Sequence, residues 1–115
     1  MNFDWLTGFY EGEGCPNWAG NKRKLRIVIT QNEKHVLLVI ASFLESRGIP
    51  SKIYPRRRKI DAKHPRVNRG WMLAVNEPHS RRLSLQLLEK MHSVSKRRQL
   101  RAALAGHFAA AKSFL

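Results

Sequence analysis

Two carboxylates stand close together near the start of the chain, in the segment Leu-Thr-Gly-Phe-Tyr-Glu-Gly-Glu-Gly at positions 6 to 14. The chain has only eight acidic residues against 22 lysines and arginines, and this segment holds Glu11 and Glu13 within one helical turn. Carboxylate oxygens are the ligands that hard cations such as Mg²⁺ prefer, with phosphate oxygens often completing the coordination. An acidic spot among basic strands that can hold DNA therefore has the chemistry for metal-assisted phosphodiester hydrolysis.

The same segment has a sequence that is unfavourable for a helix. We expect it to run from an N-cap at Asp4 to Glu13, with Gly14 in the left-handed conformation after its end. Gly8 and Gly12 share one face, and each costs about 1 kcal/mol relative to Ala. Glu13 stands at the C-terminus, where the helix dipole disfavours an anion by about 0.3–1 kcal/mol. Packing two copies through the glycines explains both costs, because the two Glu13 carboxylates then converge. A surface helix with a frayed glycine end is the alternative.

Composition sets further limits. The chain has 115 residues, a formal net charge of +14 and a sequence pI of about 11.2, which predict one domain over residues 1–115 that binds a polyanion. The single cysteine, Cys15, excludes a disulfide framework or a Cys-rich zinc site and indicates a reducing compartment. We expect an intracellular protein that is neither secreted nor bound to a membrane, because the longest apolar run, Val36 to Phe43, cannot span a bilayer.

Hydrophobic periodicity and turn residues divide the chain into short elements. In order, we expect a helix over Asp4–Glu13, a strand and turn that end at Lys22, a strand over Lys22–Gln31, a helix over Glu33–Arg47, strands over Lys52–Lys59 and Arg69–Val75, a helix whose first turn holds Pro78, and a last helix from about Ser95. Helix, two strands, helix, two strands and two helices make an α+β chain.

The glycine-rich segment resembles the nine-residue signature of the LAGLIDADG homing endonucleases. The matching positions are Leu6, the small Thr7, Gly8, the apolar Phe9 and Tyr10, the acid Glu11, the small Gly12, the acid Glu13 and the closing Gly14. The element order also matches the αββαββα core of that family, with a terminal helix added. The resemblance implies a half-saddle whose four-stranded antiparallel sheet lies in the DNA major groove.

One motif in a chain of this length implies a homodimer, with Leu6, Gly8, Phe9 and Gly12 at its interface. Two-fold protein symmetry requires a long, near-palindromic target. The resemblance further implies cleavage of both strands of double-stranded DNA with a divalent metal, Mg²⁺ or Mn²⁺, and no small-molecule substrate. The sequence leaves open whether the host gene lies in an intron, an intein, a phage or an organelle.

Site roles follow from the resemblance position by position. Glu13 matches the metal-binding catalytic acid, and we place the metal at Glu13 and Gly12. Gln31 matches a polar residue that organises water in some single-motif members. Lys96 matches the basic residue near the scissile phosphate, although the adjoining residues 97–98 leave the register open.

Two further positions are ambiguous. Glu11 matches an earlier acid that helps to fix helix ends. His35 stands where a second pocket base would be, and it is equally a surface or capping histidine at a helix start.

Alternation along the strands predicts which side chains face DNA. Arginine reads guanine through two hydrogen bonds, whereas lysine more often contacts the backbone. The basic clusters beside the last two helices, around Arg81 and Arg97, are expected to flank phosphates or to be solvated helix faces. The DNA-contact candidates are Lys22, Lys24, Arg26, Val28, Thr30, Tyr54, Arg56, Arg58, Asn68, Arg69, Met72 and Arg97.

A non-cleaving nucleic-acid-binding protein on the same fold, either an intron maturase or a transcription regulator, is the main alternative. Glu13 favours the enzyme, because a protein that only binds DNA would gain affinity by losing an anion that repels phosphate. A zinc-dependent nuclease is disfavoured, because His64, His79 and His92 share no compact ligand spacing with Cys15.

Overall fold

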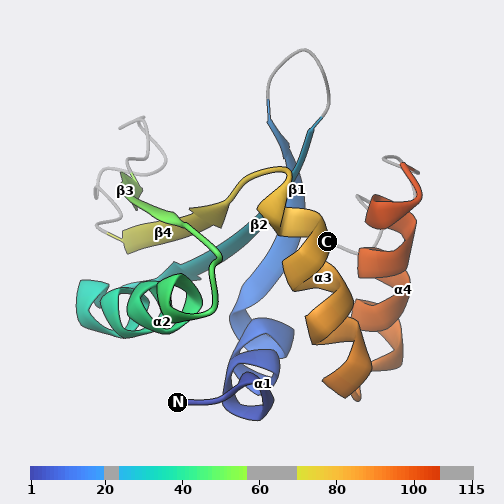
Figure 1. Cartoon of the computed structure of the whole chain (residues 1–115), viewed down its shortest axis with the longest axis horizontal. Coiled ribbons are helices and arrows are strands. Elements are labelled where there is room, and N and C mark those ends of the chain that lie inside the picture. The colour runs from blue at the N-terminus through green and yellow to red at the C-terminus, as the bar shows by residue number, and fades with distance from the viewer. Residues whose placement is uncertain (20–23, 57–69, 107–115) are drawn as a thin grey trace, which may run out of the picture.

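The structure is a computed structural model that describes residues 1–19, 24–56 and 70–106. The described residues form four helices and a four-stranded sheet, in the order predicted from the sequence (Figure 1). The elements are α1 (Phe3–Glu13), β1 (Gly14–Ala19), β2 (Lys24–Gln31), α2 (Lys34–Ser46), β3 (Lys52–Arg56), β4 (Gly70–Val75), α3 (His79–Lys90) and α4 (Val94–Leu104). The DNA-contact candidates Lys22, Arg58, Asn68 and Arg69 lie outside the described residues.

The sheet is antiparallel throughout, with strand order β1-β2-β4-β3. β1 continues directly from α1, and its first residue, Gly14, pairs with Ile29 on β2. Thr30 on β2 then pairs with Met72 on β4, which pairs with Tyr54 on β3. The fold is therefore α+β, as predicted, and the end of α1 lies at the sheet end where β2 finishes.

One face of the sheet and the four helices build the core, and Figure 1 shows the helices gathered below and to the right of the sheet. The sheet supplies Ile27, Ile29, Leu73 and Val75, all at most 1% exposed. The helices supply Leu6, Tyr10, Leu37, Ile40, Leu44, Leu83, Leu87 and Leu100. Among the described residues, no helix is long and apolar enough to cross a membrane.

Alternation places a second set of residues on the opposite face of the sheet, which we call the basic face. Its members are Cys15, Asn17, Lys24, Arg26, Val28, Thr30, Lys52, Tyr54, Arg56, Gly70, Met72 and Ala74. Tyr54 and Arg56 share this face despite the intervening Pro55, as the sequence predicted.

Two details of α1 differ from expectation. Asn2 caps the helix, because its Oδ1 accepts a hydrogen bond of 2.9 Å from the amide of Trp5, whereas Asp4 lies in the first turn and pairs with Lys90 at 3.0 Å. Gly14 is extended, with φ −102° and ψ 162°, since the chain passes straight from helix to strand. Glycine is required there for another reason: a Cβ would collide with the ring of Tyr10.

The later helices show smaller shifts. α2 ends one residue before the expected Arg47, and Gly48, with a φ of 75°, is in the left-handed region that favours glycine. α4 begins one residue before the expected Ser95, because Ser93 is its N-cap and accepts a bond of 3.3 Å from the Lys96 amide. Pro78 occupies the N-cap of α3 rather than its first turn.

Candidate active site at the junction of the first helix and first strand

Glu13 is the last residue of α1, and its side chain is exposed. The glycines that precede it on the helix are exposed too, and a Cβ added to Gly8 or Gly12 would meet nothing within 4 Å. Contacts within one copy of the chain therefore do not require glycine at either position. The space beside Gly8 and Gly12 leaves this side of α1 open to the close approach of another molecule.

An aromatic pair extends the glycine stripe toward the start of α1. Trp5 is 46% exposed and stacks on Phe9, with ring centroids 5.1 Å apart and an interplanar angle of 11°. Leu6, which we expected at the same surface, is 1% exposed and packs in the core of its own copy, because it lies on the opposite side of the helix. What we call the exposed stripe of α1 consists of the exposed residues Trp5, Gly8 and Gly12 together with the half-buried Phe9.

Lys96 reaches the same junction from α4. Its Nζ donates a hydrogen bond of 2.8 Å to the carbonyl oxygen of Gly14, the residue that follows Glu13. Of the basic residues at this position in the chain, Lys96 lies at the junction, and Arg98 is exposed on α4. A cation and an anion therefore flank the point where α1 becomes β1.

Glu11 holds α4 in place for this contact. Its two carboxylate oxygens accept hydrogen bonds of 2.9 Å from the amides of His92 and Ser93, just before α4 begins. A carboxylate is a strong acceptor at a helix N-terminus, where amides lack partners and the dipole is positive. The prediction that Glu11 fixes helix ends is confirmed.

Gln31 ends β2, two residues beyond the partner of Gly14, so it lies at the same end of the sheet as Glu13. It is half-buried, and its Oε1 accepts a bond of 2.8 Å from the amide of Asn32. His35 is exposed in the first turn of α2. Glu13, Gln31 and Lys96 thus come from three separate elements, and Glu13 and Gln31 lie at the same end of the sheet.

The basic face begins beside this junction. Burial raises the pKa of the Cys15 thiol, while the charges of Lys96, Arg56 and Arg26 oppose that rise. Three cations from α4, β3 and β2 therefore lie close enough to act on a residue two positions after Glu13. Such a field attracts phosphate.

Further along the basic face, Lys24, Lys52 and Tyr54 are exposed, and Thr30 and Met72 are half-buried. Val28 lies on this face as predicted but is only 3% exposed. β2 is an inner strand, and Val28 is flanked by Cys15 and by Ala74 on its two neighbours. Little of the Val28 side chain is therefore exposed for the DNA contact that alternation predicts.

Metal ligands are few within one copy. Among residues 1–19, 24–56 and 70–106, no group of three or more His, Cys, Asp or Glu side chains could hold a metal ion. Glu13 offers a carboxylate, and Gly12 offers a carbonyl without an intrahelical donor, because Pro16, four residues on, has no N–H. Both are oxygen donors of the kind that Mg²⁺ and Mn²⁺ accept, with phosphate or a second copy supplying the rest.

Several cations expected to flank phosphates instead bind the ends of helices. Arg97 Nη1 donates to the carbonyls of Leu88 and Met91, at 2.7 and 3.1 Å, at the end of α3. Arg82 donates to the carbonyl of Gly48, just after α2. The expectation of a phosphate contact for Arg97 therefore conflicts with the geometry of its guanidinium.

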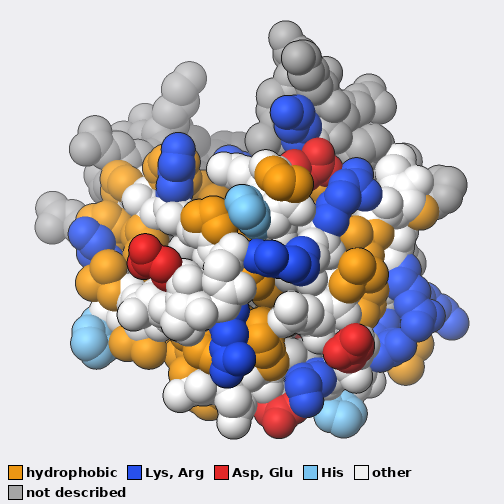
Figure 2. Space-filling model, in the orientation of Figure 1, with side chains coloured by type: hydrophobic (Ala, Val, Ile, Leu, Met, Phe, Trp, Pro, Cys, Tyr) orange, Lys and Arg blue, Asp and Glu red, His pale blue; other side chains and the backbone are white. Residues whose placement is uncertain are grey.

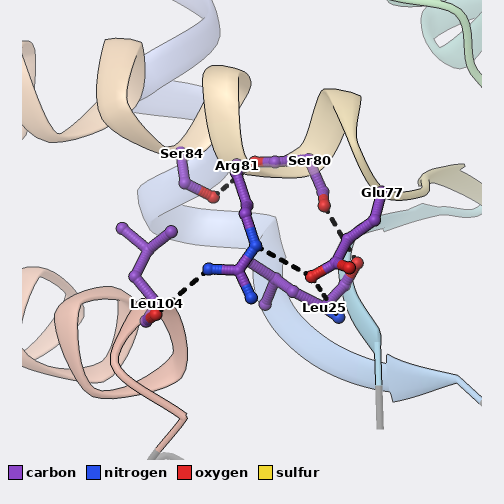
Figure 3. Close-up of polar contacts among 6 residues, drawn as sticks. All are labelled: Leu25, Glu77, Ser80, Arg81, Ser84 and Leu104. Atoms are coloured by element: carbon purple, nitrogen blue, oxygen red, sulfur yellow. Dashed lines mark hydrogen bonds and ion pairs between the residues drawn. The ribbon is translucent and has the colours of Figure 1, made fainter. Parts of the chain in front are cut away.

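Arg81 binds the C-terminal end of α4 (Figure 3). Its Nη1 donates to the carbonyl of Leu104 at 3.2 Å, and its Nε to Glu77 at 3.0 Å. Glu77 also accepts from the amide of Leu25, and the Ser80 hydroxyl donates to the Leu25 carbonyl, so the network joins β2 to both helices.

Lys96 of α4 binds in the same way at the C-terminal end of α1. Each of the four described helices therefore has, at its C-terminal end, a cation from another part of the fold. This favours the negative end of each helix dipole. The sequence did not predict these caps, since an arginine that caps a helix and an arginine that binds phosphate occur in the same helical sequence context.

Basic side chains remain on the outside of α4, where Arg98 and Arg101 are exposed. Figure 2 shows a group of Lys and Arg side chains over α4, at the right of the view, whereas those elsewhere on this face are scattered.

The chain matches known proteins at two levels. A family model described as a LAGLIDADG-like domain matches residues 2–77. No curated protein matches the chain.

Three solved structures share the fold. One is the homing endonuclease I-CvuI in complex with its target, at 18% identity and a TM-score of 0.55, covering 90% of this chain and 63% of that one. A second is the LAGLIDADG meganuclease I-AabMI bound to uncleaved DNA, at 21% identity and a TM-score of 0.64, covering 94% and 36%. A third is the homing endonuclease I-TnaI, at 14% identity and a TM-score of 0.53, covering 98% and 87%. This chain thus spans less than two thirds of the first two.

Proposed function

The chain belongs to the LAGLIDADG homing endonuclease family, and on that premise we propose that it is a site-specific double-strand DNA endonuclease. One observation carries the proposal: the exposed residue Glu13 immediately precedes Gly14, whose carbonyl accepts a 2.8 Å hydrogen bond from the ammonium of Lys96. A chain with 14 more positive than negative charges gains nothing in DNA affinity from a carboxylate at this position. It gains a ligand for a divalent metal.

Each residue at the junction has a separate role in this proposal. Glu13 and the Gly12 carbonyl would hold Mg²⁺ or Mn²⁺, and the metal when bound supplies the Lewis acid for phosphodiester hydrolysis. Lys96 would stabilise the negative charge that grows on the phosphate, because its bond to the Gly14 carbonyl keeps its ammonium at the junction where α1 ends. Gln31 orients water at the same end of the sheet.

The basic face binds the duplex. Lys24 and Arg26 come from β2, and Lys52 and Arg56 come from β3, with β4 between the two strands, so these cations spread across the sheet. A sheet of this kind can enter the major groove, where arginines distinguish guanine. Lys24 and Lys52, which are exposed, contact phosphates and set the position of the sheet.

The homodimer is built on the exposed stripe of α1. Close approach of two helices is favoured by glycine, and Gly8 and Gly12 leave the space for it. The stacked Trp5 and Phe9 supply apolar area at the edge of that contact. Two Glu13 carboxylates then meet at the two-fold axis, and the target is near-palindromic.

Selection from a randomised duplex library tests this proposal. The protein is incubated with the library and Mg²⁺, and cleaved ends are captured and sequenced. We expect ends from a related, near-palindromic set of sites. A protein that enriches a sequence by binding yet yields no cleaved ends would instead be the non-cleaving nucleic-acid-binding protein, either an intron maturase or a transcription regulator.

A further inference from the structure

The connection between α3 and α4 is held by two side chains of opposite charge. Glu11 accepts hydrogen bonds of 2.9 Å from the amides of His92 and Ser93. Arg97 donates 2.7 and 3.1 Å bonds to the carbonyls of Leu88 and Met91 on the other side of the same connection. These carbonyls lie at the C-terminus of α3, where a helix has no amides of its own left to offer.

Arg97 also adjoins Lys96 in the first turn of α4. Consecutive helical residues project about 100° apart. Lys96 therefore bonds to the start of β1 while Arg97 bonds to the end of α3, and the two contacts fix α4 against rotation about its own axis. Loss of either contact frees the helix to turn.

We infer that Arg97 is a positioning residue for Lys96, and that it contacts no DNA. The inference rests on the proposed nuclease function, because that function gives Lys96 its task beside the phosphate. Misplacement of a catalytic group by about 1 Å can lower a rate by about 100-fold. Arg97 thus acts on the rate of cleavage through the position of its neighbour.

The chain offers a matched control in Arg81. It caps α4 at the opposite end, through the Leu104 carbonyl, and is as much a helix-capping arginine as Arg97. Its contact with Leu104 lies about two turns along α4 from Lys96. Arg81→Ala and Arg97→Ala should therefore lower the melting temperature similarly, while only one of them disturbs Lys96.

The experiment compares Arg97→Ala, Arg97→Lys and Arg81→Ala on the selected duplex, with cleavage measured in single turnover at saturating protein. We expect Arg97→Ala to cleave about 10- to 100-fold more slowly, Arg97→Lys to recover part of the rate, and Arg81→Ala to keep the wild-type rate. DNA affinity and its salt slope, measured without divalent metal, should be unchanged in all three. A lower salt slope in Arg97→Ala, a wild-type rate in it, or an equal loss in Arg81→Ala would overturn the inference.

A second readout does not depend on cleavage. In protein labelled at lysine Cε, the Lys96 resonance, identified by its loss in Lys96→Arg, should move in Arg97→Ala and stay in place in Arg81→Ala. If wild-type protein does not cleave, the proposed function fails, and this resonance alone decides the inference. An unmoved resonance in folded Arg97→Lys and Arg97→Ala contradicts it.

Discussion

The ammonium of Lys96 donates a 2.8 Å hydrogen bond to the carbonyl of Gly14, the residue immediately after Glu13. α1 has no basic residue in its own last turn, so Lys96 supplies from α4 the cation that a helix C-terminus favours. The same contact offsets the unfavourable position of the Glu13 anion. One hydrogen bond thus stabilises the helix end and places a cation beside the proposed metal ligand.

Glu11→Gln should destabilise the protein by about 1–3 kcal/mol, because a carboxylate that accepts two backbone amides is replaced by a group with one acceptor. Urea denaturation measures the change in the free energy of unfolding. Glu89→Gln is the control, since Glu89 is an exposed acid for which a change within about 0.5 kcal/mol is expected. Equal effects of the two substitutions would show that the Glu11 contacts add no stability.

Gly12→Leu should leave a folded monomer. The Cβ of the added side chain would have nothing within 4 Å in its own copy, so we expect the fold to tolerate it. The leucine would fill the space into which a second α1 packs. Sedimentation velocity gives the mass, and circular dichroism confirms folding. Glu45→Leu on the exposed side of α2 is the control and should remain dimeric. A folded Gly12→Leu protein that stays dimeric argues against the packing of α1 on α1.

DNA binding should weaken steeply with salt, because each neutralised phosphate adds about 0.9 to the log–log slope. Lys24→Ala and Lys52→Ala should each lower that slope by about one such unit. Arg82→Ala should leave the slope unchanged, because the Arg82 guanidinium is bound to the carbonyl of Gly48. Fluorescence anisotropy without divalent metal measures all three. A slope that falls for Arg82→Ala and stays constant for Lys24→Ala and Lys52→Ala would contradict the assignment of phosphate contacts to the two lysines rather than to Arg82.

Stability should fall as pH rises above about 9, the ordinary pKa of the Cys15 thiol. Burial raises that pKa in the folded protein, so over this range the unfolded chain releases the thiol proton while the folded chain keeps it. The unfolded state then binds fewer protons, and higher pH favours unfolding. Cys15→Ser should remove this part of the pH dependence in urea titrations from pH 7.5 to 10. An identical pH dependence in the two proteins is the contrary result.

The sequence was informative where a local pattern has a single physical consequence. Alternation placed Arg26 and Thr30 on the face opposite the core, because strand geometry leaves no other arrangement once one face is buried. Spacing likewise placed Gly8 and Gly12 together on the exposed stripe of α1. The role of Glu11 was anticipated only through the family motif, since its partners are 81 and 82 residues away.

Other features depend on packing that no local pattern reveals. Gly14 predicted a left-handed helix end, yet it is glycine because of the approach of the Tyr10 ring. Arg97 was assigned to DNA, yet its partners are carbonyls of another helix. Val28 alternates correctly but is covered because its strand is internal. In each case the deciding contact joins segments whose distance apart is set by the whole fold.

Glu13→Gln gives the most direct test of the proposed nuclease. The substitution keeps the size of the side chain and removes the charge that would hold Mg²⁺ or Mn²⁺. Binding and cleavage of the selected duplex are measured on the same preparation, with and without Mg²⁺. We expect no double-strand cleavage, together with binding at least as tight as that of the wild type, since one anion per chain is lost. Wild-type cleavage by Glu13→Gln would contradict the central claim.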